Sequence, residues 1–290
     1  MSSVRRTRRS FGSYTRRSFG KELVFVLLAA AFCVPLYLVL TISLKTTAGA
    51  YQEPLGIPFA NPNWESYSTA ATNPNVGQVT LLESLVNSTI ITIGSVCLLI
   101  LFGGFTAYVI GRRPSKLSTG AYMMFVGGII LPFQLGIVPL YVLMRQLGLV
   151  GTHLGMILLY TGLFMPITVL LYTGFVRTLP KDYEEAAQVD GASLFRTFFR
   201  IVLPLLIPVT GTVAVITGLA VWNDFLLQLI FLSGTDRSTV VVTLYSLASQ
   251  ATQPWNEIFA GVAISVAPII LFYLFTQRTM IKGMSGGIRG

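Results

Sequence analysis

The chain has 290 residues, of which 53% are hydrophobic and only 11% are charged, and its mean hydropathy is +0.71. Soluble domains carry about 25% charged residues, so this composition excludes a soluble globular protein and indicates a chain that crosses a membrane several times. The net charge of +9 comes from basic clusters that adjoin apolar segments, which favours anionic lipid over nucleic acid as the partner of these charges.

Six windows are apolar over about 20 residues or more, the length that a helix needs to cross about 30 Å of hydrocarbon. They lie at about 23–44, 87–110, 119–144, 154–176, 204–232 and 258–277. The sequence therefore predicts an all-α membrane protein with six transmembrane helices. A basic N-terminal tail (1–22) precedes the transmembrane domain (23–279), and a C-terminal tail (280–290) follows it.

Lys and Arg residues are concentrated on one side of the predicted bundle. All but three of the 20 lie in the N-terminal tail, after span two, after span four or in the C-terminal tail; the exceptions are Lys45, Arg145 and Arg237. Cytoplasmic loops retain positive charge during insertion. Both termini and the loop at 177–203 are therefore predicted to face the cytoplasm.

The inventory of reactive side chains argues against an enzyme. His153 is the only histidine, and the two cysteines, Cys33 and Cys97, lie in separate apolar windows. Zinc needs three or four clustered ligands, so we expect no metal site, and no catalytic residue is assigned. The sequence also lacks the glycine-rich phosphate-binding loop followed by Lys-Ser or Lys-Thr, so the chain is not expected to hydrolyse ATP by itself.

The loop at 177–203 is predicted to form two short helices set at an angle. Asp182 followed by Glu185 has the form of a capping box that opens the first helix. Gly191 is suited to end this helix, because glycine tolerates a positive φ, and Ser193 is suited to cap the second. The second helix carries apolar residues at helical spacing, namely Phe195, Phe198, Phe199 and Val202.

These helices have two interpretations. Amphipathic helices with aromatic faces and basic rims often lie in the lipid headgroups. However, Glu184, Glu185 and Asp190 are acidic and gain nothing from an anionic membrane surface, so they favour a protein partner.

Glu185-Ala186-Ala187, with Gly191 six residues after the Glu and Ile201-x-Leu203-Pro204 beyond, resembles the EAA loop of ABC importer permeases. The longer segment from Leu179-Pro180 to Pro204 and Pro208 is similar to the maltose-type carbohydrate-uptake group of this family. Further matching segments extend the resemblance over about residues 80–290; they include Asn87-Ser88, Pro139-Leu140-Tyr141, Leu147-Gly148-Leu149 and Trp222-Asn223-Asp224-Phe225.

The resemblance implies a type I importer permease in the bacterial cytoplasmic membrane. Its partners would be a second permease in a heterodimer, two ATPase subunits that hold ATP and Mg, an extracytoplasmic solute-binding protein and a sugar substrate. This chain itself would carry no cofactor. The residues implied to couple to an ATPase are Glu184, Glu185, Ala186, Ala187, Asp190, Gly191, Ala192 and Phe195.

Three regions are candidates for contacts on the other side of the membrane or in the substrate path. The loops at 45–85 and 233–257 could meet the binding protein; the apolar patch from Val240 to Tyr245 in the second loop is either a re-entrant or docking element or a buried strut. Aromatic faces with amide or carboxylate groups suit sugars, and an intramembrane carboxylate indicates function. The substrate-path candidates are Trp222, Asn223, Asp224, Gln134 and Tyr141.

Three alternatives remain open at this point. The permease could serve a non-sugar solute such as glycerol phosphate, although no Lys or Arg is evident within the spans. An ion-coupled secondary transporter would need inverted repeats and buried charge pairs, and Asp224 has no obvious partner in the sequence. A membrane scaffold without transport activity would not require the arrangement from Glu185 to Pro204.

Overall fold

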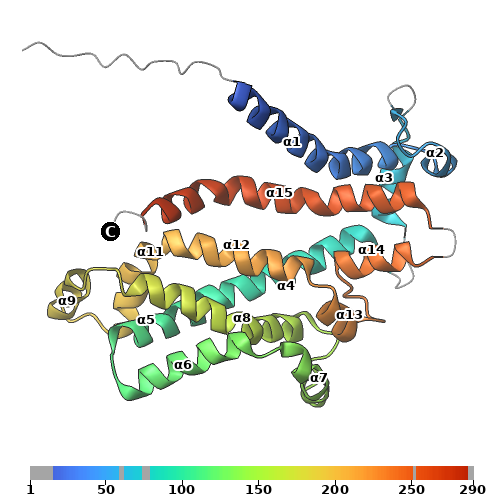
Figure 1. Cartoon of the computed structure of the whole chain (residues 1–290). Helices are drawn as coiled ribbons and strands as arrows, with labels where there is room; N and C mark the ends of the chain where they lie inside the picture. The colour runs from blue at the N-terminus through green and yellow to red at the C-terminus, as the bar shows by residue number, and fades with distance from the viewer. Residues whose placement is uncertain (1–15, 59–61, 74–78, 251–252, 287–290) are drawn as a thin grey trace, which may run out of the picture.

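The structure is a computed structural model that describes residues 16–58, 62–73, 79–250 and 253–286. These residues form helices, turns and loops with no β-strand among them, which confirms the predicted all-α fold. Figure 1 shows the long helices lying side by side. Helix α9 (Asp182–Val189) stands at one end of this bundle. At the other end lie four short helices: α2 (Thr47–Gln52), α3 (Glu65–Thr72), α13 (Leu226–Leu232) and α14 (Val240–Ala248).

Helix α8 (His153–Val176) is the centre of the bundle. It packs against four helices: α4 (Leu81–Leu98), α5 (Gly104–Arg112), α6 (Lys116–Ile130) and α12 (Ile207–Asn223). Helices α4 and α5 are joined by a π-helical segment, Leu99–Gly103, and together with it form one continuous helix. The buried side chains at these contacts form the two main apolar clusters of the chain.

Within the part of the chain that the structure describes, four helices are long and apolar enough to cross a membrane in one piece: α1 (Arg16–Ser43), Leu81–Arg112, α8 and the first part of α15 (Trp255–Gly286). They match the first, second, fourth and sixth predicted windows. Helix α15 continues past residue 277, where the sixth span was expected to end, and includes most of the segment expected as a C-terminal tail. The basic N-terminal tail lies outside the described residues up to residue 15.

The third and fifth windows are bent or interrupted, so the described residues contain six spans, as predicted, when each bent helix pair is counted as one span. Helix α6 ends at Ile130, and the chain bends by 94° before the segment Phe133–Gln146, which contains α7 (Ile137–Gln146). Pro132 stands at this bend, and a proline has no N–H for the helical ladder. The fifth window is interrupted too, because α12 ends at Asn223 and α13 (Leu226–Leu232) begins after a break.

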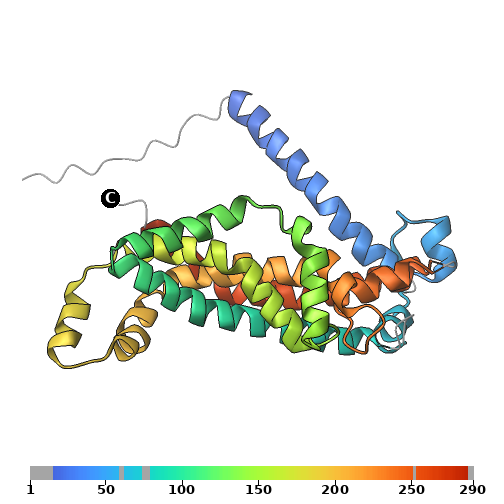
Figure 2. The ribbon, with the colours of Figure 1, turned by 90° about the horizontal axis from the view of Figure 1, so that it is seen from below.

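Helix α1 stands apart from the rest of the bundle. It contacts α15, but its N-terminal part leans away, as Figure 2 shows. Large apolar side chains along it are exposed, and Phe32 reaches 78%. Such a helix is stable where lipid covers it, in agreement with a membrane-spanning role.

The loop at 45–85 has packing of its own. Its helices α2 (Thr47–Gln52) and α3 (Glu65–Thr72) contact the start of α15. The Asn256 side chain on α15 connects to both short helices. Thr47 Oγ1 on α2 donates to its Oδ1 at 3.1 Å, and its Nδ2 donates to Ser66 Oγ on α3 at 2.9 Å. Residues 59–61 and 74–78 of this loop lie outside the described residues.

The apolar patch after span five forms helix α14 (Val240–Ala248). The backbone N–H of Val240 donates to Ser88 Oγ at 3.0 Å, and the hydroxyls of Ser84 and Thr243 lie 2.6 Å apart. Several of its apolar side chains, including Val242 and Leu247, are buried. This packing against α4 supports the buried strut over the docking element.

Candidate functional site

The loop between α8 and α12 projects from one end of the bundle (Figure 2). It begins with α9 (Asp182–Val189), which carries three acidic residues in its first turn, where the helix dipole favours negative charge. The predicted capping box is wrong in detail. Lys181 is the N-cap without a side-chain hydrogen bond, and Asp182 is the first residue of the helix.

Gly191 ends the first helix as predicted. Its φ is +76°, a conformation that disfavours any side chain. The N–H of Gly191 donates to the Gln188 carbonyl at 3.0 Å, and the N–H of Ala192 donates to the Ala187 carbonyl at 2.9 Å. This pair of bonds is the Schellman motif, which satisfies the last carbonyls of the helix and turns the chain sharply.

The second helix is short, and its hydrogen-bonding pattern changes from α-helical to π-helical and back along its length. Ser193 caps it by accepting from the Arg196 N–H at 3.4 Å, as predicted. Helix α10 (Leu194–Thr197) continues into a π-helical turn (Phe198–Val202) and α11 (Leu203–Leu205). The segment Leu194–Leu205 then meets α12 at 79°.

The apolar face predicted for the second helix is divided between the core and the surface. Phe198 and Val202 are buried in the cluster that includes Tyr108 and Tyr172. Phe195 is 61% exposed, although its ring stacks on Phe105 at 4.8 Å between centroids. The buried half fixes the loop on α5 and α8, and the exposed half remains available to a partner.

Most predicted coupling residues lie together on the exposed surface of the loop. On α9, Asp182, Glu185, Ala186 and Val189 recur at i, i+3, i+4 and i+7 and therefore share one face, which we call the α9 face. All four are exposed. Two further predicted residues, Asp190 and Gly191, are exposed beside them, whereas Ala187 is buried and Ala192 is half-buried.

Two further residues of this surface were not predicted from the sequence. Val189 is 88% exposed, the highest value among the large apolar side chains that the structure describes, and Tyr183 is 56% exposed. Helical spacing from Glu185 was the signal that could have placed Val189 on the α9 face.

Glu184 is turned away from the exposed surface, unlike the other acidic residues of the loop. Its Oε1 accepts from Arg112 Nε at 2.7 Å, and only 8% of its side chain is exposed. The structure thus places Glu184 against the end of α5, not among the residues exposed to a partner.

A cavity of about 480 Å³ lies between α6, α8 and α12. Its wall combines aromatic and aliphatic side chains with one carboxylate, that of Asp224; other lining residues include Phe133, Tyr160, Phe164, Pro166 and Ile216. The size and the mixture of aromatic faces with a polar group are typical of a small-molecule site.

Asp224 has a partner that the sequence did not reveal. Its Oδ2 accepts from the Tyr160 hydroxyl at 2.7 Å and from the Leu227 N–H at 3.1 Å. Both bonds use Oδ2 and neither uses Oδ1. No salt bridge among the described residues involves this carboxylate. Asp224, the C-cap of α12, therefore joins the end of this helix to α8, and its side chain also binds an N–H of the first turn of α13.

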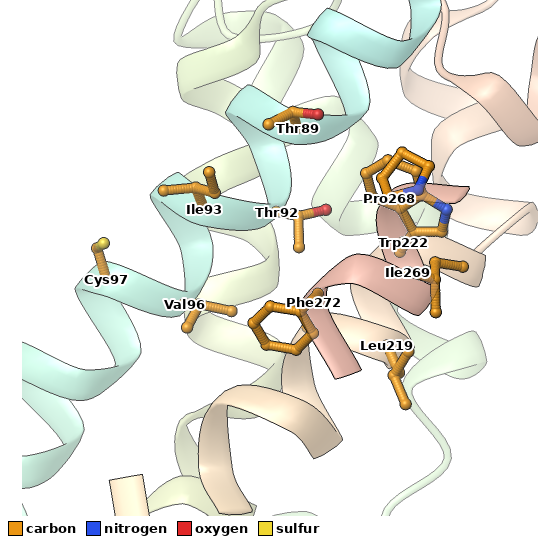
Figure 3. A pocket seen from close by; sticks show the side chains of 11 residues that line it. Thr89, Thr92, Ile93, Val96, Cys97, Leu219, Trp222, Pro268, Ile269 and Phe272 are labelled. Atoms are coloured by element: carbon orange, nitrogen blue, oxygen red, sulfur yellow. The ribbon is translucent and has the colours of Figure 1, made fainter. Parts of the chain in front are cut away.

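The other substrate-path candidates are not brought together with Asp224. Trp222 lines a separate, apolar cavity of about 370 Å³ with Pro268 and Phe272 (Figure 3). Asn223 is exposed and donates to the Leu219 carbonyl of its own helix. Two more candidates are not among the residues that line the cavity of Asp224: Gln134 is exposed in the turn before α7, and Tyr141 packs edge-on against Phe231.

A helical bundle with several membrane-crossing helices, an angled helix pair at one end and a cavity between helices that is open to the surface is the architecture of an integral membrane subunit of a transport system. The family model of the binding-protein-dependent transport system inner membrane component matches residues 99–286, and the chain belongs to this family. This confirms the resemblance to ABC importer permeases. The family consists of multi-pass membrane subunits, not of enzymes.

Curated relatives match most of the chain. The melibiose/raffinose/stachyose import permease protein MelC of Bacillus subtilis is 34% identical over 266 residues, which cover 91% of this chain and 94% of the relative. The probable starch degradation products transport system permease protein AmyC of Thermoanaerobacterium thermosulfurigenes is 32% identical, with 90% and 93% covered. The diacetylchitobiose uptake system permease protein NgcG of Streptomyces coelicolor is also 32% identical, with 91% and 86% covered.

A solved structure shares the fold. A chain of a bacterial ABC transporter involved in the import of the acidic polysaccharide alginate superposes with a TM-score of 0.76, covering 91% of this chain and 98% of that chain. The sequence identity is 19%, so this likeness supports the architecture and not the solute.

Proposed function

We propose that the chain is one of two permease subunits of an ATP-driven, binding-protein-dependent importer of oligosaccharides, and that the loop 177–203 faces the cytoplasm and docks on an ATPase subunit. The observation that carries this proposal is the α9 face, an exposed surface next to a sharp Schellman turn at the end of a bundle that belongs to an importer family. The partners inferred are a second permease, two ATPases that bind ATP and Mg, and a solute-binding protein.

The chemistry of the loop suits a cleft on another protein. Glu185 supplies a carboxylate for a basic or N–H donor group, and Ala186 lets two backbones approach closely. Val189 and Phe195 add apolar contact area that water would otherwise cover. When ATP closes the ATPase pair, the docked loop moves with it and tilts the attached helices, which opens the cavity toward the binding protein.

An oligosaccharide is favoured as solute by the relatives and by the cavity. The three relatives carry names of sugar importers. In the cavity, Asp224 offers a carboxylate oxygen to sugar hydroxyls, and the rings of Phe133 and Phe164 offer apolar faces. A phosphate ester is disfavoured, because the lining residues described contain this carboxylate and neither Lys nor Arg.

Replacing Asp224 by Asn tests the cavity as the sugar path. Asn retains a side-chain oxygen that can accept the Leu227 N–H, so the start of α13 is kept while the charge is lost. Hydrogen bonds to a charged group are stronger than neutral ones by about 1 kcal/mol, so we expect sugar uptake per ATP hydrolysed to fall by about five- to tenfold. The measurement is labelled-oligosaccharide uptake and phosphate release in proteoliposomes that contain the complete importer.

The same proteoliposomes test the class of solute. Melibiose, raffinose and maltotriose are offered in parallel with glycerol 3-phosphate, and we expect accumulation of at least one sugar. Tyr141→Phe is the control, because Tyr141 is also a substrate-path candidate but packs against Phe231 and does not line this cavity. Uptake of glycerol phosphate alone, or equal sugar uptake by Asp224→Asn and the unchanged chain, would contradict this assignment.

A further inference from the structure

Arg112, the last residue of α5, connects three parts of the chain. Its Nε donates to Glu184 Oε1 on α9 at 2.7 Å, and its Nη2 donates to the Leu179 carbonyl after α8 at 2.9 Å. The Arg112 side chain is 10% exposed and the Glu184 side chain is 8% exposed. The other ion pair among the described residues, Arg237 with Asp236, is longer and more exposed, at 3.9 Å with side chains 40% and 88% exposed.

Helix α9 has little else to hold it. It is eight residues long, and Glu184 and Ala187 are its only buried residues. Its covalent connections are a turn after Pro180 on one side and the Gly191 turn on the other. Its main packing partners are α10 and the π-helical turn that follows, both within the same loop. The Arg112–Glu184 pair is therefore a direct polar link between α9 and the span Leu81–Arg112, and Tyr108 of the same span also interacts with Glu184.

A buried ion pair is not retained for stability alone. The cost of removing both charges from water largely offsets their attraction, and buried pairs are often replaced by apolar residues without loss of stability. In some proteins buried polar or ionic groups instead select one arrangement of the packed elements. Two N–H groups of Arg112 are used here, one bound to Glu184 on α9 and one to the Leu179 carbonyl just before α9, so the guanidinium holds α9 and its N-terminal connection to the end of α5.

We propose that Arg112 and Glu184 are a positioning pair that transmits displacement of α9 to the span Leu81–Arg112 during transport. The inference rests on the proposed docking of the loop on an ATPase. It gives Glu184 and Glu185 opposite tasks, since Glu185 faces the partner and Glu184 faces the chain's own membrane domain. A pull on α9 thus reaches α5 through the ion pair as well as through the peptide chain.

The experiment uses the complete importer in proteoliposomes and four forms of the chain: unchanged, Arg112→Lys, Glu184→Gln, and the exchanged pair Arg112→Glu with Glu184→Arg. Lys keeps the positive charge but lacks the second donor arm that reaches Leu179, and Gln keeps the shape of Glu184 without its charge. Three quantities are measured for each form: assembly of the four-subunit complex, ATP hydrolysis without binding protein, and its stimulation by sugar-loaded binding protein.

We expect both single variants to assemble and to keep unstimulated ATP hydrolysis, while stimulation by the binding protein falls by about fivefold or more. The exchanged pair should regain part of the lost stimulation, because it restores opposite charges at the same two positions. The proposal would be overturned if Glu184→Gln kept full stimulation. It would also be overturned if stimulation fell only in proportion to a smaller amount of assembled complex. If the unchanged chain itself shows no stimulation, the proposed docking of the loop fails instead, so the two failures are distinguishable.

Discussion

Replacing Gly191 by Val is expected to uncouple ATP hydrolysis from transport while leaving the membrane domain folded. Gly191 has a φ of +76°, and a Cβ at this position would meet no atom within 4 Å, so strain arises from the backbone alone. A side chain in this conformation costs about 1–2 kcal/mol, and more for a β-branched residue. The Schellman turn would open, and α9 and α10 would lose the angle at which they present the α9 face.

The expected loss is about five- to thirtyfold in the stimulation of ATP hydrolysis by sugar-loaded binding protein, the factor that corresponds to this strain. Gly148→Val is the matched control. Its φ is +68°, a Cβ there also meets nothing within 4 Å, and it lies in the turn before α8, whereas the loop lies beyond the other end of α8. Equal stimulation in Gly191→Val and the unchanged protein, or an equal loss in the control, would contradict a specific role of this turn.

Replacing Gly155 by Ala is expected to reduce the amount of folded protein in the membrane severely. A Cβ on Gly155 would lie 2.1 Å from the backbone oxygen of Leu149 and 2.9 Å from its carbonyl carbon. Backbone atoms cannot move aside as a flexible side chain can, so the turn between α7 and α8 must open. Overpacking of this kind costs about 1–3 kcal/mol, and the first turn of the central helix would lose its start.

The measurement is the melting temperature and membrane yield of the purified chain, and we expect a decrease of several degrees, in the range of about 2–4 °C per kcal/mol. Gly174→Ala provides the comparison within the same helix, because a Cβ there meets nothing within 4 Å. Alanine in a helix interior normally stabilises relative to glycine, so this control should melt no lower than the unchanged chain. A Gly155→Ala chain that melts like Gly174→Ala would show that the turn tolerates a side chain.

The helices were predictable from hydropathy, because each membrane-crossing helix must be apolar over its whole length. The all-α class and the approximate positions of the windows follow from this constraint, and α1 and α8 agree with it closely. The bends were not predictable in the same way. A hydropathy window does not register a change of direction, so the 94° turn at Pro132 and the break after Asn223 were read as parts of continuous spans.

The structure of the coupling loop was also predictable from the sequence only in part. Gly191 and Ser193 were recognised because turns and caps depend on local chemistry that a few consecutive residues reveal. The direction of Glu184 depends on Arg112, which lies 72 residues earlier, and Asp224 meets Tyr160 from 64 residues away. Such pairs form only when the packed bundle brings distant segments together, so a single sequence cannot assign them.

The most direct test of the account is whether the α9 face touches an ATPase subunit. A photo-reactive benzoylphenylalanine is introduced at Val189, which is 88% exposed on this face, and at Leu135, which is 79% exposed in the turn between α6 and α7. In the assembled importer, illumination should join position 189 to an ATPase subunit and should not do so for position 135. Absence of an ATPase adduct at 189 in a complex that still hydrolyses ATP in response to binding protein would contradict the account.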